Sequence, residues 1–167
     1  MTEKSVPAGE CPFCKKNISD SAFMQSETFL AIYNIAPLLR GHSLVIPRRH
    51  VKSLFELSKS ELAEFILFSR SVTLLLLEAF TGDGFDWSVQ EGNSSGQSVP
   101  HLHLHIVIRK PNDMEGESEW YLKIKENENR FLDSDSRARL SDEEYRFYTN
   151  YLKNQFEIQK IRLSQEK

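Results

Sequence analysis

The sequence of 167 residues predicts an α+β fold with an antiparallel sheet of about five strands, one long central helix and a C-terminal helix. Strand-like runs come in two groups, and each group is followed by one segment with helical periodicity. The connections between successive strands are tight, and strands and helices do not alternate regularly. This order favours an antiparallel sheet over a parallel α/β arrangement.

Five runs rich in β-branched, aromatic and aliphatic residues predict the strands. They cover residues 23–24, 29–33, 43–46, 85–90 and 101–109. A sheet of this size leaves an edge strand whose backbone groups can pair with a second copy of the chain.

Two capping boxes predict where the helices begin. Ser58 and Glu61 precede the first helix, and Gly82 suits its C-terminal end. Ser141 and Glu144 begin a second helix over residues 141–160. At a period of 3.6 residues, the apolar face of the first helix comprises Leu62, Phe65, Ile66, Ser69, Val72, Leu76 and Ala79.

Length and composition predict a single domain over residues 1–167, with a loose leader at 1–10 and a long loop at about 110–140. Within that loop, Trp120, Tyr121, Leu122 and Ile124 could add a short strand or dock on the domain. The formal net charge of −3 argues against a nucleic acid polymer as partner. Without a long apolar span or a signal core, no membrane partner is expected and the predicted location is cytoplasmic.

Three of the five histidines stand at alternate positions, at His101, His103 and His105, with Leu102 and Leu104 between them. A period of two is that of a β-strand, so the three imidazoles are expected on one face and the leucines on the other. Imidazole has an unperturbed pKa of about 6.5, so it is partly a free base at neutral pH. Such a row is suited to nucleophilic or metal chemistry.

The two cysteines, Cys11 and Cys14, form a Cys-x-x-Cys pair. Such a pair can be a redox couple, half of a zinc site or a coincidence, and the lack of a surrounding βαβ pattern favours zinc. A structural zinc needs four ligands, and with no further cysteine the others must be histidines. The candidates are His42, His50, His101, His103 and His105.

The loop over residues 90–99 lies between two predicted strands and is rich in small, hydrogen-bonding residues. Gly92 and Gly96 allow close backbone approach, and Gln97 and Ser98 offer donors that could cradle an anionic oxygen. Taken alone, the loop is better interpreted as a solvated hairpin loop, because Gly- and Ser-rich loops are common, but its end three residues before His101 favours a role beside the histidines. Asn34 is either a binder of paired hydroxyls or a turn residue, and His42 is either a buried support for another histidine or a surface residue.

The segment from His101 to Val107 resembles the signature of the histidine triad superfamily of nucleotide hydrolases and transferases. Residues 96–99 and 41–47 are similar to two other recurrent segments of that family. The third histidine, His105, indicates a hydrolase, because the uridylyltransferase branch carries Gln there. Asn34, Gln90, Gln97 and the C-terminal extension are most similar to the fragile histidine triad branch. Ile108 departs from the family by standing where many members have Pro.

The resemblance implies a hydrolase of dinucleoside polyphosphates such as diadenosine triphosphate, acting as a homodimer, with His103 as nucleophile. It implies phosphate contacts by Gln97, Ser98 and His105, a ribose contact by Asn34, a contact near the phosphate chain by Gln90, and support of the triad by His42. Mg²⁺ could accompany the polyphosphate. Similarity to zinc-containing bacterial members implies a structural Zn²⁺ held by Cys11, Cys14, His50 and His101.

Three alternatives come from the same residues. A catalytic zinc could sit on the three triad histidines, which the spare cysteine pair argues against. A non-catalytic nucleotide-binding regulatory module could keep the triad for binding alone, which an intact His103 argues against. Within the enzyme reading, a nucleoside phosphoramidate hydrolase is the second candidate.

Overall fold

The computed structural model describes residues 11–113 and 137–165 of the chain. Its five strands are β1 (Ala22–Gln25), β2 (Phe29–Tyr33), β3 (Ser43–Pro47), β4 (Gly84–Val89) and β5 (Leu104–Arg109). They form one antiparallel sheet in the order β1-β2-β3-β5-β4. The predicted α+β architecture is confirmed. The predicted leader at 1–10, and most of the predicted long loop with Trp120, Tyr121, Leu122 and Ile124, lie outside the described residues.

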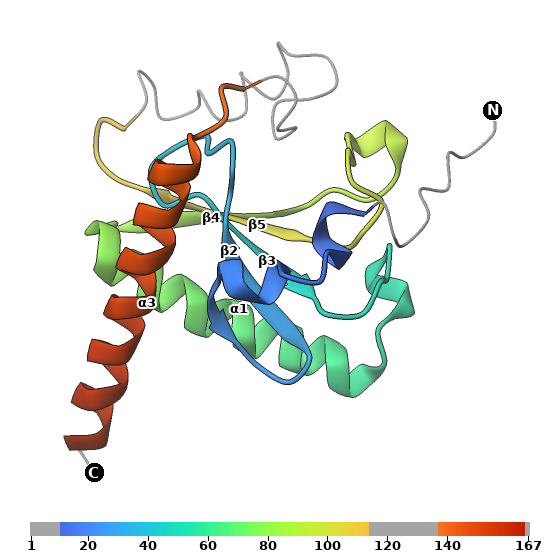
Figure 1. Cartoon of the computed structure of the whole chain (residues 1–167). Coiled ribbons are helices and arrows are strands. Elements are labelled where there is room, and N and C mark those ends of the chain that lie inside the picture. The colour runs from blue at the N-terminus through green and yellow to red at the C-terminus, as the bar shows by residue number, and fades with distance from the viewer. Residues whose placement is uncertain (1–10, 114–136, 166–167) are drawn as a thin grey trace.

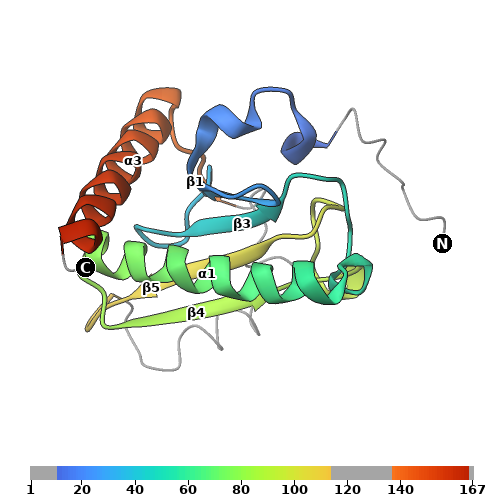
Figure 2. The ribbon, with the colours of Figure 1, turned by 90° about the horizontal axis from the view of Figure 1, so that it is seen from below.

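Two long helices, α1 (Lys59–Phe80) and α3 (Asp142–Gln165), pack against the same face of the sheet. Figure 2 shows α1 running across β5 and β4, while α3 lies beside β1. The main core between them is built from aromatic and aliphatic side chains such as Phe29, Phe65, Leu76, Ile106 and Leu152, all at most 1% exposed. None of the described helices has the length and apolar character needed to cross a membrane.

The opposite face of the sheet carries a second apolar cluster, formed by Ala22, Leu30, Ile32, Leu44 and Ile46. Within the described residues, four short 3₁₀ helices lie in the connections: η2 (Pro12–Cys14), η3 (Ile18–Ser21), η4 (Leu54–Glu56) and η5 (Asn93–Ser95). Side chains from the first two, Phe13 and Ile18, cover this second cluster. The N-terminal segment is therefore a third layer, on the face that α1 does not cover (Figure 1).

Both predicted capping boxes are present. The Ser58 side chain accepts a hydrogen bond from the Glu61 backbone N–H, and the Glu61 carboxylate accepts one from the Ser58 N–H. Ser141 and Glu144 make the same reciprocal pair before α3. The C-terminal helix extends to Gln165, beyond the predicted 141–160, because residues 161–165 contain no glycine or proline that would end it.

The predicted apolar face of α1 is partly wrong. Leu62 and Ile66 are 40% and 47% exposed, and the buried stripe instead includes Phe68, Leu75 and Phe80. The helix is apolar over most of its circumference, so the hydrophobic period does not single out the face that meets the sheet.

The predicted strand over 101–109 begins later, at Leu104. Ahead of it, the His101 N–H bonds to the Val99 carbonyl at 2.8 Å, and the Leu102 N–H bonds to the Val51 carbonyl at 2.6 Å. Because these backbone donors are satisfied by loops, His101 and His103 precede the strand and only His105 is part of the sheet. The expectation of three imidazoles in a row along one strand is therefore corrected.

The C-terminal end of α1 also differs from the expectation for Gly82. The left-handed residue is Thr81, with φ 51° and ψ 46°, and the Gly82 N–H closes the turn on the Leu77 carbonyl at 3.0 Å. A Cβ on Gly82 would collide with the Ile108 side chain. Glycine is therefore required here by the close approach of α1 to β5.

Replacing Gly82 by Ala tests this packing. We expect the free energy of unfolding to fall by about 1–3 kcal/mol, the usual cost of overpacking a core. Gly84→Ala is a matched control, because a Cβ there would meet Arg109 Cβ at an ordinary 3.6 Å. Urea unfolding of both variants measures the difference, and equal stabilities for the two would contradict the account.

Candidate functional site

Two cysteines and two histidines converge at the N-terminal side of the triad. One ligand atom from each of Cys11, Cys14, His50 and His101 lies within 4.8 Å of the others. The Cys11 and Cys14 sulfurs are each 3.5 Å from His101 Nδ1, and Cys14 Sγ is 3.2 Å from His50 Nδ1. Tetrahedral zinc with ordinary Zn–S and Zn–N bonds places sulfur and nitrogen about 3.6 Å apart. The cluster therefore has the donors and the dimensions of a tetrahedral metal site.

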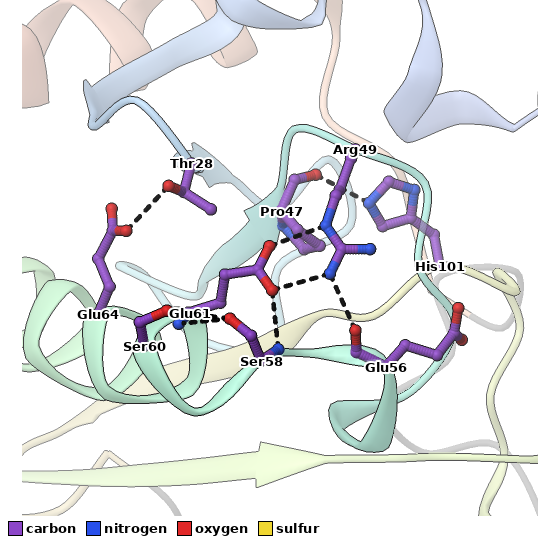
Figure 3. A network of polar contacts seen from close by, with 9 residues as sticks. All are labelled: Thr28, Pro47, Arg49, Glu56, Ser58, Ser60, Glu61, Glu64 and His101. Carbon is purple, nitrogen blue, oxygen red and sulfur yellow. Dashed lines mark hydrogen bonds and ion pairs between the residues drawn. The ribbon is translucent and has the colours of Figure 1, made fainter.

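The tautomer of His101 fits this arrangement. Its Nε2 lies 2.9 Å from the Pro47 carbonyl oxygen, which can only accept, so Nε2 carries the proton (Figure 3). The Nδ1 lone pair is then free, and Nδ1 is the atom that faces both sulfurs. Hydrogen bonding of the second ring nitrogen to a carbonyl is the usual support of a metal-bound histidine.

The loop that carries His50 is fastened to the start of α1. Arg49 forms a two-pronged ion pair with Glu61, at 2.9 and 3.0 Å, and also donates to the Glu56 carbonyl at 2.9 Å (Figure 3). Cys11 is the N-cap of the single turn of η2, and Cys14 is its last residue. Three local structures thus present the four donors.

The Cys14 thiol carries its proton in the absence of a cation. Burial, followed by the neighbouring Cys11, raises the pKa of Cys14 to about 11. A metal ion reverses this preference because it binds the thiolate, so metal binding releases protons and weakens as pH falls.

His103 has a defined tautomer. Its Nδ1 lies 2.7 Å from the His101 carbonyl oxygen. Since that oxygen only accepts, Nδ1 carries the proton and Nε2 keeps its lone pair. Burial lowers the pKa of His103, so the ring is neutral at pH 7. A neutral imidazole with a free Nε2 is a competent nucleophile.

A second chain of hydrogen bonds orients His105. The Leu38 N–H donates to His42 Nδ1 at 3.0 Å, so the proton of neutral His42 is on Nε2. His42 Nε2–H then donates to His105 Nδ1 at 2.9 Å, which leaves the His105 proton on its Nε2. The ring centroids of His103 and His105 are 4.9 Å apart. The triad therefore presents a lone pair on His103 beside an N–H donor on His105.

Both members of this chain are buried and uncharged. Burial lowers the pKa of His42 to about 3, with Arg137 and His103 adding to the effect. Burial also lowers the pKa of His105 well below its usual value, with His103, His42 and Arg137 adding to it. The structure thus places His42 as a buried support.

Asn34 lies at the end of β2, where its side chain joins this network. Its Oδ1 accepts from the Ala36 N–H at 2.9 Å, which is a turn contact. Its Nδ2 is 3.3 Å from His42 Nε2. Since that nitrogen already donates to His105, the two donors are packed together without sharing a hydrogen bond.

The loop after β4 has the backbone expected of it. Gly92 and Gly96 have φ of 78° and 83°, and Ser98 is exposed. Gln97, however, uses its side chain within the protein: Oε1 accepts from the Gly92 N–H at 2.8 Å, and Nε2 donates to the Lys52 carbonyl at 3.2 Å. Gln90 is half-buried and directly follows β4, one residue beyond the pair Val89–Leu104.

Sequence reasoning missed the apolar wall beside the triad. In the sheet, Leu44 and Ser88 flank His105, and Ile32 pairs with Leu44, so all four share one face. The Phe13 ring contacts both His101 and His103, at centroid distances of 5.6 Å. No alternation marks this face, because β2 and β3 are buried on both sides.

Arg137 was also missed, because it lies far from any motif. Its Nε donates to the Ala36 carbonyl at 2.6 Å, and the next described residues continue to Leu140, whose N–H bonds to the Ile35 carbonyl at 2.8 Å. The segment before α3 is thereby fixed to the loop that follows β2. No local sequence signal predicts such a contact over a separation of 101 residues.

Comparison with known proteins agrees with this geometry. The profile of the HIT domain matches residues 15–112. A bis(5'-adenosyl)-triphosphatase of Dictyostelium discoideum is 38% identical over 109 residues, which are 65% of this chain and 73% of that protein. An asymmetrical bis(5'-nucleosyl)-tetraphosphatase of Schizosaccharomyces pombe is 34% identical over 116 residues, 70% of this chain and 64% of that protein.

The fold is shared with a solved structure over almost the whole chain. A zinc-bound histidine triad family protein of Mycobacterium smegmatis superposes with a TM-score of 0.63 at 24% identity, covering 96% of this chain and 99% of that one. The sheet, the two long helices and the hydrogen-bonded histidines define a domain that holds several imidazole side chains next to one face of its sheet. Because the profile spans more than half of its length, the chain belongs to the HIT domain family.

The buried neutral histidines make the free energy of unfolding depend on pH. His42 has a pKa of about 3 in the folded state and about 6.5 when unfolded. The unfolded chain therefore binds a proton first as pH falls, so stability is present above about pH 6.5 and is lost progressively toward pH 3. Between pH 7 and pH 5, we expect His42 to contribute a loss of about 2 kcal/mol.

Urea unfolding of the metal-loaded protein at both pH values measures this loss, and comparison with a variant removes the pH dependence of metal binding, which the two proteins share. A His42→Gln variant should lose about 2 kcal/mol less than the wild type between the two values, because it takes up one proton fewer. An identical pH dependence in the two proteins would show that His42 is not held neutral.

Proposed function

We propose that this protein hydrolyses dinucleoside polyphosphates at the α-phosphate through a nucleotidyl-histidine intermediate on His103, releasing a nucleoside monophosphate. The observation that carries the proposal is the 2.7 Å contact between His103 Nδ1 and the His101 carbonyl, which leaves Nε2 unprotonated. The names of the two curated relatives, a triphosphatase and a tetraphosphatase acting on such compounds, support the substrate class.

In the first step, the His103 Nε2 lone pair attacks the α-phosphorus. The P–N bond forms while the bond from phosphorus to the bridging oxygen breaks, and the remaining nucleotide leaves. Water then cleaves the P–N bond, which restores the neutral imidazole. Two easier displacements thereby replace one difficult one.

The charge on the phosphoryl oxygens needs donors in this buried setting. The His105 Nε2–H is one, because its Nδ1 accepts from His42. The exposed Ser98, with its hydroxyl and backbone N–H, is a second, and it could pass a proton to the leaving group. Gln97 acts through the loop that it braces, since its amide is bonded to Gly92 and Lys52.

The nucleoside is proposed to lie against Phe13, which is only partly buried, covers Ile32 and Leu44 and contacts His103 of the triad. Asn34, at the end of β2, would contact the ribose, and Gln90 would lie near the phosphate chain. Mg²⁺ is proposed only as an ion carried by the polyphosphate.

Replacing His103 tests the nucleophile. Because the attacking atom is lost, His103→Asn should lower kcat by roughly 10⁴-fold or more while nucleotide binding persists. Hydrolysis is measured with a panel of diadenosine polyphosphates and adenosine phosphoramidates, and AMP binding by calorimetry. Near-wild-type hydrolysis by His103→Asn would refute the assignment, and a preference of the wild type for phosphoramidates would move the enzyme to the other substrate class.

For the metal, we propose Zn²⁺ in a structural role. The donor set of two cysteines and two histidines suits zinc and leaves no open position for a substrate or a water. Of the described residues, this is the one group able to hold a metal, and it takes only His101 from the triad. The alternative of a catalytic zinc on all three triad histidines finds no support in this geometry. Thiolate ligands persist where thiols stay reduced, which supports the predicted cytoplasmic location.

Metal analysis tests this role. Protein purified without chelators should contain one zinc per chain. Cys14→Ser should lose the ion and lower the free energy of unfolding by several kcal/mol, since small zinc sites supply about 10–16 kcal/mol of binding energy. Chelation should inactivate slowly, in step with unfolding. Immediate loss of activity in a folded protein would indicate a catalytic ion instead.

The chain is further proposed to form a homodimer through the outer edge of β4, the last strand of the sheet among the described residues. That strand ends the sheet, and its Phe85 is 48% exposed. On neighbouring α1, Ile66, Leu67 and Leu74 are between 47% and 62% exposed, so edge and helix together form an apolar surface.

Light scattering measures the mass, which should be twice the 19.4 kDa of one chain. Phe85→Asp should yield monomers, because it places a charge in the proposed interface. Phe147→Asp is the control, since Phe147 is 60% exposed on α3, away from this edge. A monomeric wild type would exclude the dimer.

A further inference from the structure

Glu91, just after β4, joins two loops that each serve a different part of the site. Its Oε1 accepts a hydrogen bond from the Leu54 backbone N–H at 2.6 Å, and its Oε2 accepts one from the Ser53 hydroxyl at 2.8 Å. The Ser53 oxygen in turn accepts from the Phe55 N–H at 3.1 Å, where it caps η4. Both carboxylate oxygens are therefore used to hold the segment that precedes α1.

That segment starts at the metal cluster. His50 supplies one donor atom, and the chain then runs alongside the loop after β4 and the approach to the triad. The Val51 carbonyl accepts from the Leu102 N–H at 2.6 Å, and the Lys52 carbonyl accepts from Gln97 at 3.2 Å. Together with the two contacts of Glu91 to Ser53 and Leu54, hydrogen bonds hold each residue of the segment 51–54.

The loop after β4 has little else to fix it. Gly92, Asn93, Ser94, Ser95 and Ser98 are exposed, and the loop contributes no side chain to either apolar cluster. Local opening costs little where few apolar groups are buried. The loop's position relative to the triad therefore depends on hydrogen bonds at its two ends, those of Glu91 and of Gln97.

We propose that Glu91 is a positioning residue that fastens the metal-bearing loop to the phosphate-facing loop, and so sets the affinity for the substrate's phosphates. This inference rests on the proposed function for its substrate. A loop that spends only part of its time in the competent position weakens binding by that fraction. The ground state and the transition state lose the same contacts, so KM rises and kcat changes little.

The test is the kinetics of Glu91→Ala with diadenosine triphosphate. If the competent population falls to roughly one tenth, KM rises about tenfold while kcat stays within about twofold. Glu91→Gln should be intermediate, because the amide keeps the acceptor for Leu54. Adding Ser53→Ala to Glu91→Ala should cause no further rise of KM, since the contact between these two side chains is already lost.

Glu64→Ala is the matched control. Glu64 also uses both oxygens across the chain, accepting from Ser26 at 2.7 Å and from Thr28 at 2.8 Å, away from the site (Figure 3). It should leave KM unchanged. An equal rise of KM in this control, or an unchanged KM in Glu91→Ala, would overturn the proposal. Should Glu91→Ala not fold, Glu91→Gln must raise KM without lowering the melting temperature, because it changes the contact with Ser53 and keeps the acceptor for Leu54.

AMP binding separates this inference from the proposed function. If the wild type hydrolyses no dinucleoside polyphosphate, the proposed function fails. The Kd for AMP, compared between the wild type and Glu91→Ala, then still tests the positioning role of Glu91. A Kd about tenfold weaker in the variant supports it, and an equal Kd contradicts it. Zinc content should be the same in all variants, because the four ligands are untouched.

Discussion

Every polar group of His101 has a partner, and the two halves of the site are joined through this residue. Its Nδ1 faces the cysteine sulfurs, and its Nε2–H bonds to the Pro47 carbonyl at the end of β3. Its backbone N–H bonds to Val99, and its carbonyl accepts from His103 Nδ1. The residue that completes the metal cluster thus also fixes the tautomer of the proposed nucleophile, and a displacement at the cluster would be transmitted directly to His103.

His42, His103 and His105 are kept neutral by burial, which lowers the pKa of each and suits their proposed roles. A protonated His103 has no lone pair to attack phosphorus, and a protonated pair at His42 and His105 would place unpaired charges in the interior. The donor–acceptor order from Leu38 through His42 to His105 gives one arrangement of protons without any charge. Keeping these rings neutral lowers the free energy of unfolding in acid, because the unfolded chain binds protons that the folded chain does not.

The sequence predicted the features that depend on local pattern. Both capping boxes, the five-stranded antiparallel sheet and the glycine turns of the loop after β4 follow from short-range chemistry. The family resemblance pointed to Cys11, Cys14, His50 and His101, which the fold brings within 4.8 Å. What failed depended on tertiary context. Leu62 and Ile66 are exposed rather than buried, because α1 is apolar over most of its circumference and its sequence does not show which face meets the sheet. The last strand begins at Leu104, because the N–H groups of His101 and Leu102 bond to loop carbonyls.

Other parts of the site carry no sequence signal at all. The hydrogen bond between the Glu91 carboxylate and the Leu54 N–H joins residues far apart in the chain, and so does the hydrogen bond from Arg137 to the Ala36 carbonyl. Each links one side chain to one backbone group. The apolar wall lies on strands buried on both faces, so no alternation separates it from the core. Such features become visible only when the register of the sheet is known.

The central claim is that the His101 carbonyl holds His103 as a neutral ring with its proton on Nδ1. Nitrogen-15 NMR of histidine-labelled protein at pH 7 reports the protonation of each ring nitrogen directly. We expect a protonated Nδ1 and an unprotonated Nε2 for His103, assigned by comparison with His103→Asn. A proton on Nε2, or a doubly protonated ring, would contradict it.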